Sequence, residues 1–351
     1  MTLDHIVPLD GFRALAILIV FVAHCGLERL IPGGFGVTIF FFLSGYLITT
    51  LLRSEYAQTG RIDIKAFYIR RSVRILPSLY ITLLLILGIS QWLPAEHPAE
   101  FWGVFSQLVF LTNYPWITGY AQGVTGPPLW SLAVEEHFYL IFPVVFSAIL
   151  AALSPRKAAG LCLGACIAVL GIRLATVATI SDIGQVYYWT HTRIDSILFG
   201  CCLALWQNPV LDKGAWRPRL VHVLFALAIL LGCFAIRDEL FRQTVRYTLQ
   251  GGALFVIFSY AIQDRGWVSI ALSTRPLRVI ALYSYTLYLI HVPVIAGVHA
   301  LFPTLGLLGI IGISGALSML YAAGMYALVE QPAANWRRRL RSSSRTAALA
   351  I

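Results

Sequence analysis

Residues 37–52 read VTIFFFLSGYLITTLL, a run of sixteen positions without a charged side chain. A helix needs roughly 17–25 mostly apolar residues to cross a bilayer core. Comparable apolar runs occupy 12–30, 76–93, 129–153, 158–177, 190–206, 220–236, 247–263, 279–301 and 305–329. The pattern predicts an all-α membrane protein, a polytopic bundle of about ten transmembrane helices. The shorter run at 101–111 predicts a re-entrant or interfacial helix.

The composition agrees with this interpretation. The chain has 351 residues, of which 58% are hydrophobic and 12% are charged, and its mean hydropathy is +0.77. A soluble domain would carry about 25% charged residues. The same figures exclude a disordered chain, a collagen and a disulfide-stapled secreted fold. The net charge of +10 could indicate nucleic acid, but basic residues in a membrane protein first mark its cytoplasmic loops. We therefore expect membrane lipids, and no nucleic acid, among the partners.

The basic residues also predict the orientation. Of the 26 Lys and Arg, 19 fall in the stretches that ten spans would leave inside: 53–75, 154–157, 207–219, 264–278 and 330–351. If 101–111 also spanned, the later basic loops would lie outside, against the positive-inside rule. We therefore expect both termini in the cytoplasm and a multi-pass protein of the cell (inner) membrane. Residues 1–336 are expected to form one membrane domain, followed by a basic cytoplasmic tail over 337–351.

Ionisable residues at membrane depth are functional candidates, because each costs about 2.5–3.5 kcal/mol to insert at the bilayer centre. At 1.5 Å per residue, His24, Glu135 and Glu136 lie about 9–10 Å below the predicted outer face, and Asp195 falls in the same layer. A carboxylate beside an imidazole makes a general base. The residues alone leave two other roles open, helix packing and a proton relay in a transporter. The other members of the set are Arg13, His137, Arg173, His191, Arg193 and His291.

Three arginines precede the third predicted span. On a helix, Arg74 shares a face with Arg71 (i, i+3) and with Arg70 (i, i+4). Guanidinium groups at the inner surface suit a phosphorylated ligand, because each offers a bidentate fork to phosphate. Ordinary positive-inside anchoring would produce the same pattern.

No metal site is expected. The six cysteines all lie in apolar runs without C-x-x-C or His-rich spacing, so we interpret them as small buried hydrophobes. The sequence also contains no P-loop, no G-x-G-x-x-G and no H-E-x-x-H motif.

Several motifs follow one another along the chain. They are LDGFRALA at 9–16, with Asp10 and Arg13, followed by His24; FFFLSGYLI at 40–48, with Ser44; RRSVRILP at 70–77; WSLAVEEHFYL at 130–140; TRID at 192–195, with Arg193 and Asp195, running on to Gly200; SYTLYLIH at 284–291, with Tyr288 and His291, then Pro293; and EQP at 330–332. In this order the chain resembles the acyltransferase-3 family of integral membrane O-acyltransferases, over about residues 8–332.

The resemblance implies an enzyme that moves an acyl group, usually acetyl, from cytoplasmic acyl-CoA to a hydroxyl, often on a sugar of a cell-envelope or secreted glycan. It implies His24 as the catalytic histidine, Arg13 in the same motif, and Glu135 and Glu136 as an acidic pair. Arg70, Arg71 and Arg74 would engage acyl-CoA, a donor substrate and not a tightly bound cofactor. Further candidates are Asp10, Ser44, Arg193, Asp195, Tyr288 and His291.

The resemblance also bears on partners. The acceptor is expected to be a carbohydrate or glycolipid. Many members carry a C-terminal extracytoplasmic esterase-like domain, whereas this chain stops after the tenth predicted span. It is therefore expected to act alone or to pass its acyl group to a separate extracytoplasmic partner.

Two mechanisms and two rival functions follow from these residues. His24 could deprotonate the acceptor hydroxyl, or it could carry the acyl group itself. A proton-coupled transporter would use His24, Glu135 and Asp195 as a proton relay. Such a transporter is expected to contain inverted repeats, which the sequence does not show clearly. A non-enzymatic membrane partner would use the same polar layer only for packing.

Overall fold

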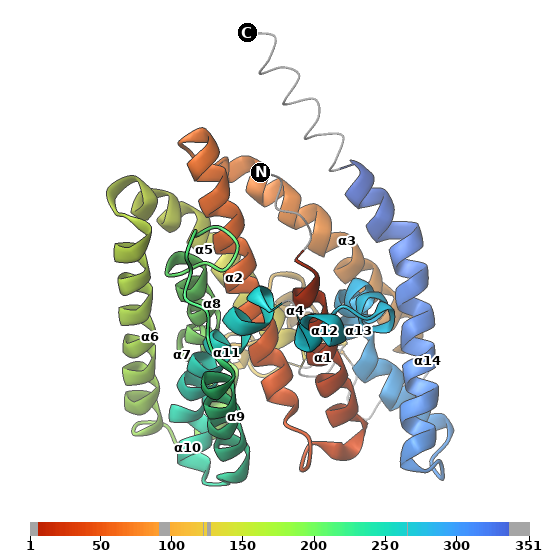
Figure 1. Ribbon diagram of the computed structural model, residues 1–351. Coiled ribbons are helices and arrows are strands. Elements are labelled where there is room, and N and C mark those ends of the chain that lie inside the picture. Colours follow the sequence, from red (N-terminus) through yellow and green to blue (C-terminus); the bar gives the residue numbers. More distant parts are fainter. Residues whose placement is uncertain (1–5, 91–98, 122, 125–127, 265, 337–351) are drawn as a thin grey trace. The chain divides into compact units, whose positions relative to one another are not determined.

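The computed structural model describes residues 6–90, 99–121, 123–124, 128–264 and 266–336. Over these residues every regular element is a helix, as the apolar runs predict (Figure 1). The α-helices are α1 Val7–Val22, α2 Gly33–Thr59, α3 Ile64–Ser90, α4 Phe101–Leu108, α5 Leu129–Ala152, α6 Pro155–Val177, α7 Thr190–Arg193, α8 Asp195–Leu205, α9 Leu220–Ala235, α10 Glu239–Gln243, α11 Val245–Gln263, α12 Trp267–Leu272, α13 Arg275–Leu301 and α14 Leu307–Met325. The predicted tail over 337–351 lies outside the described residues.

Seven helical segments among the described residues are long and apolar enough to cross a membrane: Val7–Leu27, Gly33–Thr59, Ile64–Ser90, Leu129–Ala152, Pro155–Val177, Arg275–Leu301 and Leu307–Trp336. The other three predicted spans coincide with α7 and α8, which are separated by Ile194 alone, with α9 and with α11. The count of about ten spans stays a prediction. The short run at 101–111 forms α4, whose eight residues would cover only about 12 Å, too little to cross.

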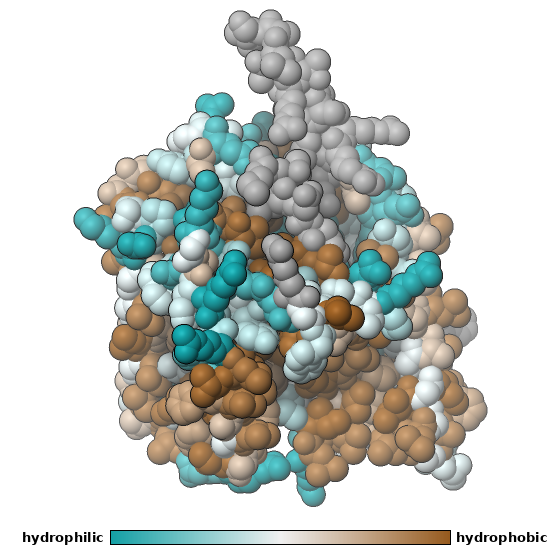
Figure 2. Space-filling view, viewed as in Figure 1, coloured by the Kyte–Doolittle hydropathy of each residue, from teal (hydrophilic) through white to brown (hydrophobic). Residues whose placement is uncertain are grey.

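Large apolar side chains lie on the surface of these helices. On α5, the exposed residues include Leu140, Ile141, Val144 and Val145, and hydrophobic residues cover wide areas of the face shown in Figure 2. A soluble monomer rarely exposes contiguous apolar patches larger than a few hundred Å² to water. In a membrane the lipid tails cover such patches, so the apolar side chains do not contact water. The chain is a multi-pass membrane protein.

The chain divides into two compact units. The first comprises Met1–Ile62, Phe110–Tyr114 and Trp130–Leu282, and the second comprises Asp63–Val109, Pro115–Leu129 and Tyr283–Ile351. Each unit is built from segments that lie far apart in the sequence.

A close helix crossing forms the centre of the first unit. α8 packs against α2, α6 and α11. A Cβ atom on Gly45 would lie 1.9 Å from the carbonyl oxygen of Ile197, and one on Gly200 would lie 2.1 Å from that of Phe42. Glycine is therefore required on both sides, and the two backbones touch as small residues allow in membrane bundles. This crossing holds α2, which carries Ser44, against α8, which begins at Asp195.

The second unit contains α3, the later part of α13, α14 and the π-helical segment Tyr326–Glu330. Glu330 accepts hydrogen bonds from Ser78 of α3 (3.3 Å) and from Thr286 of α13. The Thr82 hydroxyl lies 2.8 Å from that of Tyr321. The first residue of the EQP motif is thus a polar centre that ties three helical segments together.

Candidate functional site

His24 lies in a π-helical turn, Ala23–Leu27, that follows α1. Its Nδ1 is 2.8 Å from the carbonyl oxygen of Val20. A carbonyl can only accept, so Nδ1 bears a proton, and in the neutral imidazole Nε2 then carries the lone pair. Inside this turn Gly26 departs from helical geometry, and its φ of +100° favours glycine. Such π-turns occur often at functional sites, and this one presents a half-buried imidazole in a base-competent tautomer.

Arg13 lies on the same helix but far from His24. Eleven residues along an α-helix span about 16 Å, so these two side chains cannot act on the same atom. The Arg13 guanidinium approaches the Asp10 carboxylate at 3.5 Å within one turn of α1. The structure therefore brings Asp10 and Arg13 together, three turns from the histidine.

Glu135 is part of a polar cluster between α2 and α5. The Ser44 hydroxyl donates to Glu135 Oε1 at 2.9 Å. The Tyr139 hydroxyl lies 2.9 Å from Ser44 Oγ and 3.2 Å from Glu135 Oε2. One phenolic proton serves two acceptors, so it can satisfy only one of them at a time. Ser44 and Glu135 are each only partly buried, so the cluster is open to a neighbouring group. The adjacent Glu136 points about 100° away around the helix.

Asp195 forms a buried ion pair instead of facing a substrate. Its Oδ2 lies 2.8 Å from Arg173 Nη2, and neither side chain has any exposed surface. Arg173 also donates to the carbonyl oxygen of Thr192 at 2.7 Å, and the Thr248 hydroxyl donates to Asp195 Oδ2 at 3.3 Å. A pair enclosed in this way locks α6, the start of α8 and α11 together.

Arg193 is enclosed by aromatic rings. Its guanidinium carbon lies 3.8 Å from the ring centroid of Tyr247 and 5.1 Å from that of Tyr187, and Nη2 donates to the Thr38 hydroxyl at 3.2 Å. Burial raises the pKa of the Tyr187 phenol to about 12, so this ring is neutral and the contact is a cation–π interaction. The rings of Phe41 and Trp130 lie on further sides. Arg193 therefore stabilises the packing of the first unit.

A stack of aromatic and imidazole rings lies where segment 110–114 meets α5 and α7. His137 Nδ1 lies 2.7 Å from the Thr190 hydroxyl, which also accepts a 2.7 Å hydrogen bond from the Asn113 amide. The Tyr114 hydroxyl lies 3.1 Å from Nδ1 of the exposed His191, and their rings stack at 5.9 Å. Asn113, Tyr114 and Thr190 were missed by sequence reasoning, because they lie outside every motif.

The remaining predicted residues belong to the second unit. Arg70, Arg71 and Arg74 lie in the first half of α3, which continues without a break into the predicted span that begins at 76. The Arg71 guanidinium lies 5.9 Å from the Phe67 ring. Tyr288 donates to the carbonyl oxygen of Pro128 at 2.7 Å. The fully buried His291 directs Nδ1 to the carbonyl oxygen of Tyr288 at 2.8 Å. No group of metal-ligating side chains occurs in the part of the chain that the structure describes.

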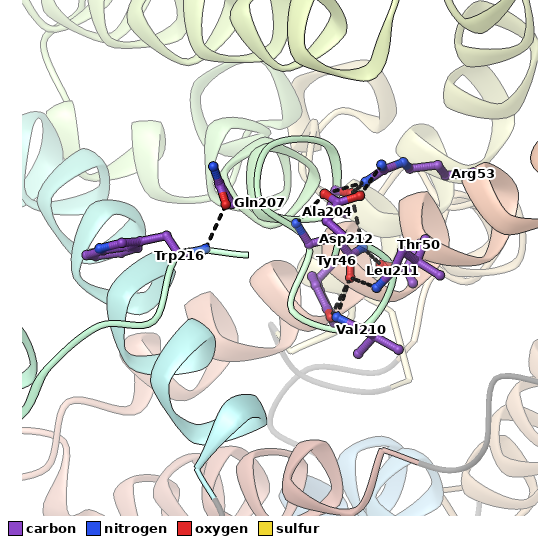
Figure 3. A network of polar contacts seen from close by, with 10 residues as sticks. Tyr46, Thr50, Arg53, Ala204, Gln207, Val210, Leu211, Asp212 and Trp216 are labelled. Atoms are coloured by element: carbon purple, nitrogen blue, oxygen red, sulfur yellow. Dashed lines mark hydrogen bonds and ion pairs between the residues drawn. The ribbon is translucent and has the colours of Figure 1, made fainter. Parts of the chain in front are cut away.

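A second network was not anticipated from the sequence (Figure 3). Arg53, near the end of α2, binds both carboxylate oxygens of Asp212 and donates to the carbonyl oxygen of Ala204 at 2.9 Å. Asn208 donates to the Thr50 hydroxyl at 2.9 Å. The carbonyl of the Asn208 amide accepts from the backbone N–H groups of Val210 and Leu211, at 2.9 and 3.2 Å. These bonds fix the loop after α8. Arg53 and Asp212 each resembled ordinary loop charges in the sequence.

Comparisons with known proteins agree with these features. The model of the acyltransferase domain matches residues 6–329. The O-acetyltransferase OatA of Staphylococcus aureus (strain NCTC 8325 / PS 47) is 31% identical over 307 residues, which cover 83% of this chain and 51% of that protein. A protein of S. aureus (strain COL) whose name gives O-acetyltransferase as an inferred activity is also 31% identical, over 95% of this chain and 59% of its own.

The chain thus spans 51–59% of the length of these relatives. No solved structure matches it significantly. Because the family model covers nearly the whole chain, the protein belongs to the acyltransferase-3 family of membrane acyltransferases.

Proposed function

We propose that the protein is a membrane O-acyltransferase that moves an acyl group, acetyl above all, from cytoplasmic acyl-CoA to a sugar hydroxyl of a cell-surface or exported glycan. The observation that carries this proposal is the π-turn at His24. With Nδ1 donating to Val20, the neutral imidazole has its lone pair on Nε2, the nitrogen that can take a proton from a hydroxyl. Membership of the family supplies the reaction class.

In the proposed reaction His24 acts as the general base. Nε2 takes the proton of the acceptor hydroxyl while the hydroxyl oxygen attacks the thioester carbonyl carbon. A C–O bond forms, the C–S bond breaks, and the CoA thiolate takes the proton back from His24. The competing route transfers the acyl group first to Nε2 and then to the acceptor.

The acidic pair is assigned two separate roles. Glu135 accepts a hydrogen bond from Ser44 and shares the Tyr139 proton with that serine, which suits a carboxylate that fixes α2 against α5. We assign Glu136, whose side chain leaves the helix in a different direction, to the stabilisation of the imidazolium that forms when Nε2 of His24 takes the proton. E135Q and E136Q separate these roles, because only E136Q is expected to change the pH profile of turnover.

The donor and acceptor sides follow from the predicted orientation. Arg70, Arg71 and Arg74 lie on the predicted cytoplasmic half of α3, where the phosphates of CoA are available. The ring stack of Tyr114, His137 and His191 lies toward the predicted outer face. Aromatic and imidazole rings with hydroxyl and amide partners suit a carbohydrate, which offers C–H groups to ring faces and hydroxyls to polar groups.

The test compares envelope glycans by mass spectrometry from cells that express the wild type, H24Q or no protein. H24Q is expected to lower O-acetylation at least a hundredfold while the protein inserts and melts as the wild type does. Unchanged acetylation in H24Q cells would overturn the assignment of the base. Incubation with labelled acetyl-CoA and no acceptor distinguishes the two routes, because only the relay leaves label on His24.

A further inference from the structure

We propose that the first unit contains a binding site for a phosphate-bearing ligand, distinct from the arginines of α3. A cavity of about 430 Å³ lies between the end of α2, the beginning of α6 and the loop after α8. This volume falls within the range of small-molecule sites. The lining residues that carry the argument are Arg53, Ser154, Arg156, Gln207, Asp212 and Lys213.

The charge of the lining favours an anion. Arg53 and Asp212 neutralise each other in a bidentate pair. Arg156 and Lys213 form no ion pair within the part of the chain that the structure describes, and both are exposed. The cavity therefore has an uncompensated charge of about +2 at neutral pH.

The beginning of α6 adds to this charge. Ser154 is the N-cap residue, and its side chain makes no capping hydrogen bond. Pro155 has no N–H and that of Ala158 donates to the Ser154 carbonyl, so the backbone N–H groups of Arg156 and Lys157 are the ones available to a ligand, and the helix macrodipole favours negative charge there. Two cations beside such a helix end are the arrangement that binds phosphate, which accepts hydrogen bonds on several oxygens at once.

The opposite wall is preorganised. Gln207 has a φ of +62°, a left-handed conformation that is strained for a non-glycine residue. Its side chain accepts a 2.7 Å hydrogen bond from the backbone N–H of Trp216. Together with the bonds of Asn208 and Asp212 (Figure 3), this contact holds the loop that carries Lys213 in one conformation. A rigid wall lowers the ordering cost of binding.

The predicted topology places all three segments on the cytoplasmic side, where two sources of phosphate meet. One is the phosphorylated nucleotide of CoA, and for this source the inference rests on the proposed use of acyl-CoA. The other is the headgroup of an anionic lipid of the inner leaflet. Both present the same chemistry to Arg156 and Lys213.

The experiment compares R156A/K213A with K157A/R217A in nanodiscs. The second variant removes the same charge from the same two segments but from side chains that do not line the cavity. In nanodiscs of phosphatidylcholine, the Kd for CoA is measured by calorimetry, with 3′-dephospho-CoA to locate the phosphate. In nanodiscs that also contain phosphatidylglycerol, native mass spectrometry counts the anionic lipids retained.

If CoA is the source of the phosphate, R156A/K213A raises the Kd for CoA roughly tenfold or more. The Kd of K157A/R217A then stays within about twofold of the wild-type value. If a lipid is the source, the Kd for CoA is unchanged and R156A/K213A retains fewer phosphatidylglycerol molecules than the control. Equal CoA binding and equal lipid retention in both variants would overturn the inference. A wild type that does not bind CoA would refute the donor in the proposed function, and the lipid measurement would still test the cavity.

Discussion

Replacing Arg173 with methionine tests whether the buried pair of the first unit serves folding or chemistry. Methionine fills most of the volume but removes the cation that lies 2.8 Å from Asp195. It also removes the donor to the carbonyl oxygen of Thr192. Asp195 would then be a buried carboxylate without its counter-ion, a loss that costs about 3–5 kcal/mol.

This free energy converts to a measurable loss of thermal stability. At roughly 2 °C per kcal/mol for a chain of this size, the midpoint of R173M should fall by about 6–10 °C. The midpoint is measured in nanodiscs by the fluorescence of a thiol-reactive dye, which reports exposure of the buried cysteines. R237M serves as the control, because Arg237 is exposed and its loss should change stability by less than about 0.5 kcal/mol.

The double variant R173M/D195N provides the decisive comparison. It removes both charges, so no isolated ion remains, and we expect it to recover more than half of the lost stability. The folded fraction of each variant should retain acyl transfer within about threefold of the wild type. A midpoint of R173M equal to that of R237M, or a double variant no more stable than R173M, would refute this reasoning.

Three further predictions concern other elements. G26A should lower the free energy of unfolding by about 1–2 kcal/mol, because φ there is +100°, and thermal melting measures this loss. The same change should affect kcat more strongly than KM, with a lower kcat in acyl-transfer kinetics. G200V should prevent the α2–α8 contact and lower the free energy of unfolding by about 3 kcal/mol or more, so the variant should yield no monodisperse protein. The control G164V on α6, where a Cβ meets no atom within 4 Å, should yield monodisperse protein. S44A removes a donor to Glu135 and should lower the free energy of unfolding by about 1.5–3 kcal/mol without changing the pH dependence of turnover, which thermal melting and pH–rate profiles measure.

Hydropathy predicted the helices well because lipid imposes one requirement, that backbone groups bond within the segment. The run at 37–52 is contained in α2, and the run at 190–206 forms α7 and α8 on either side of Ile194. Helix ends beyond the membrane were harder to predict. α2 continues to Thr59, because polar residues extend a helix once it has begun.

The partners of the polar residues could not be predicted, because depth says nothing about direction around a helix. His24, Glu135 and Asp195 were expected in one layer, yet Asp195 pairs with Arg173 and Glu135 binds Ser44. Residue spacing gives the depth of a side chain in the membrane. Which residue it pairs with depends on which helices pack against its own. The π-turn at His24 contains one extra residue per turn, and the hydropathy of the predicted span 12–30 does not indicate where that extra residue falls.

The aromatic cage of Arg193 also determines the order in which the chain can be assembled. During synthesis the rings of Phe41, Trp130 and Tyr187 precede the arginine, but Tyr247, the ring nearest its guanidinium, follows 54 residues later. Until α11 enters the bilayer, one face of this cation lacks its cover and the Arg173–Asp195 pair lacks Thr248. A nascent chain released before α11 should therefore be a substrate for membrane quality control, whereas a chain that includes α11 should not.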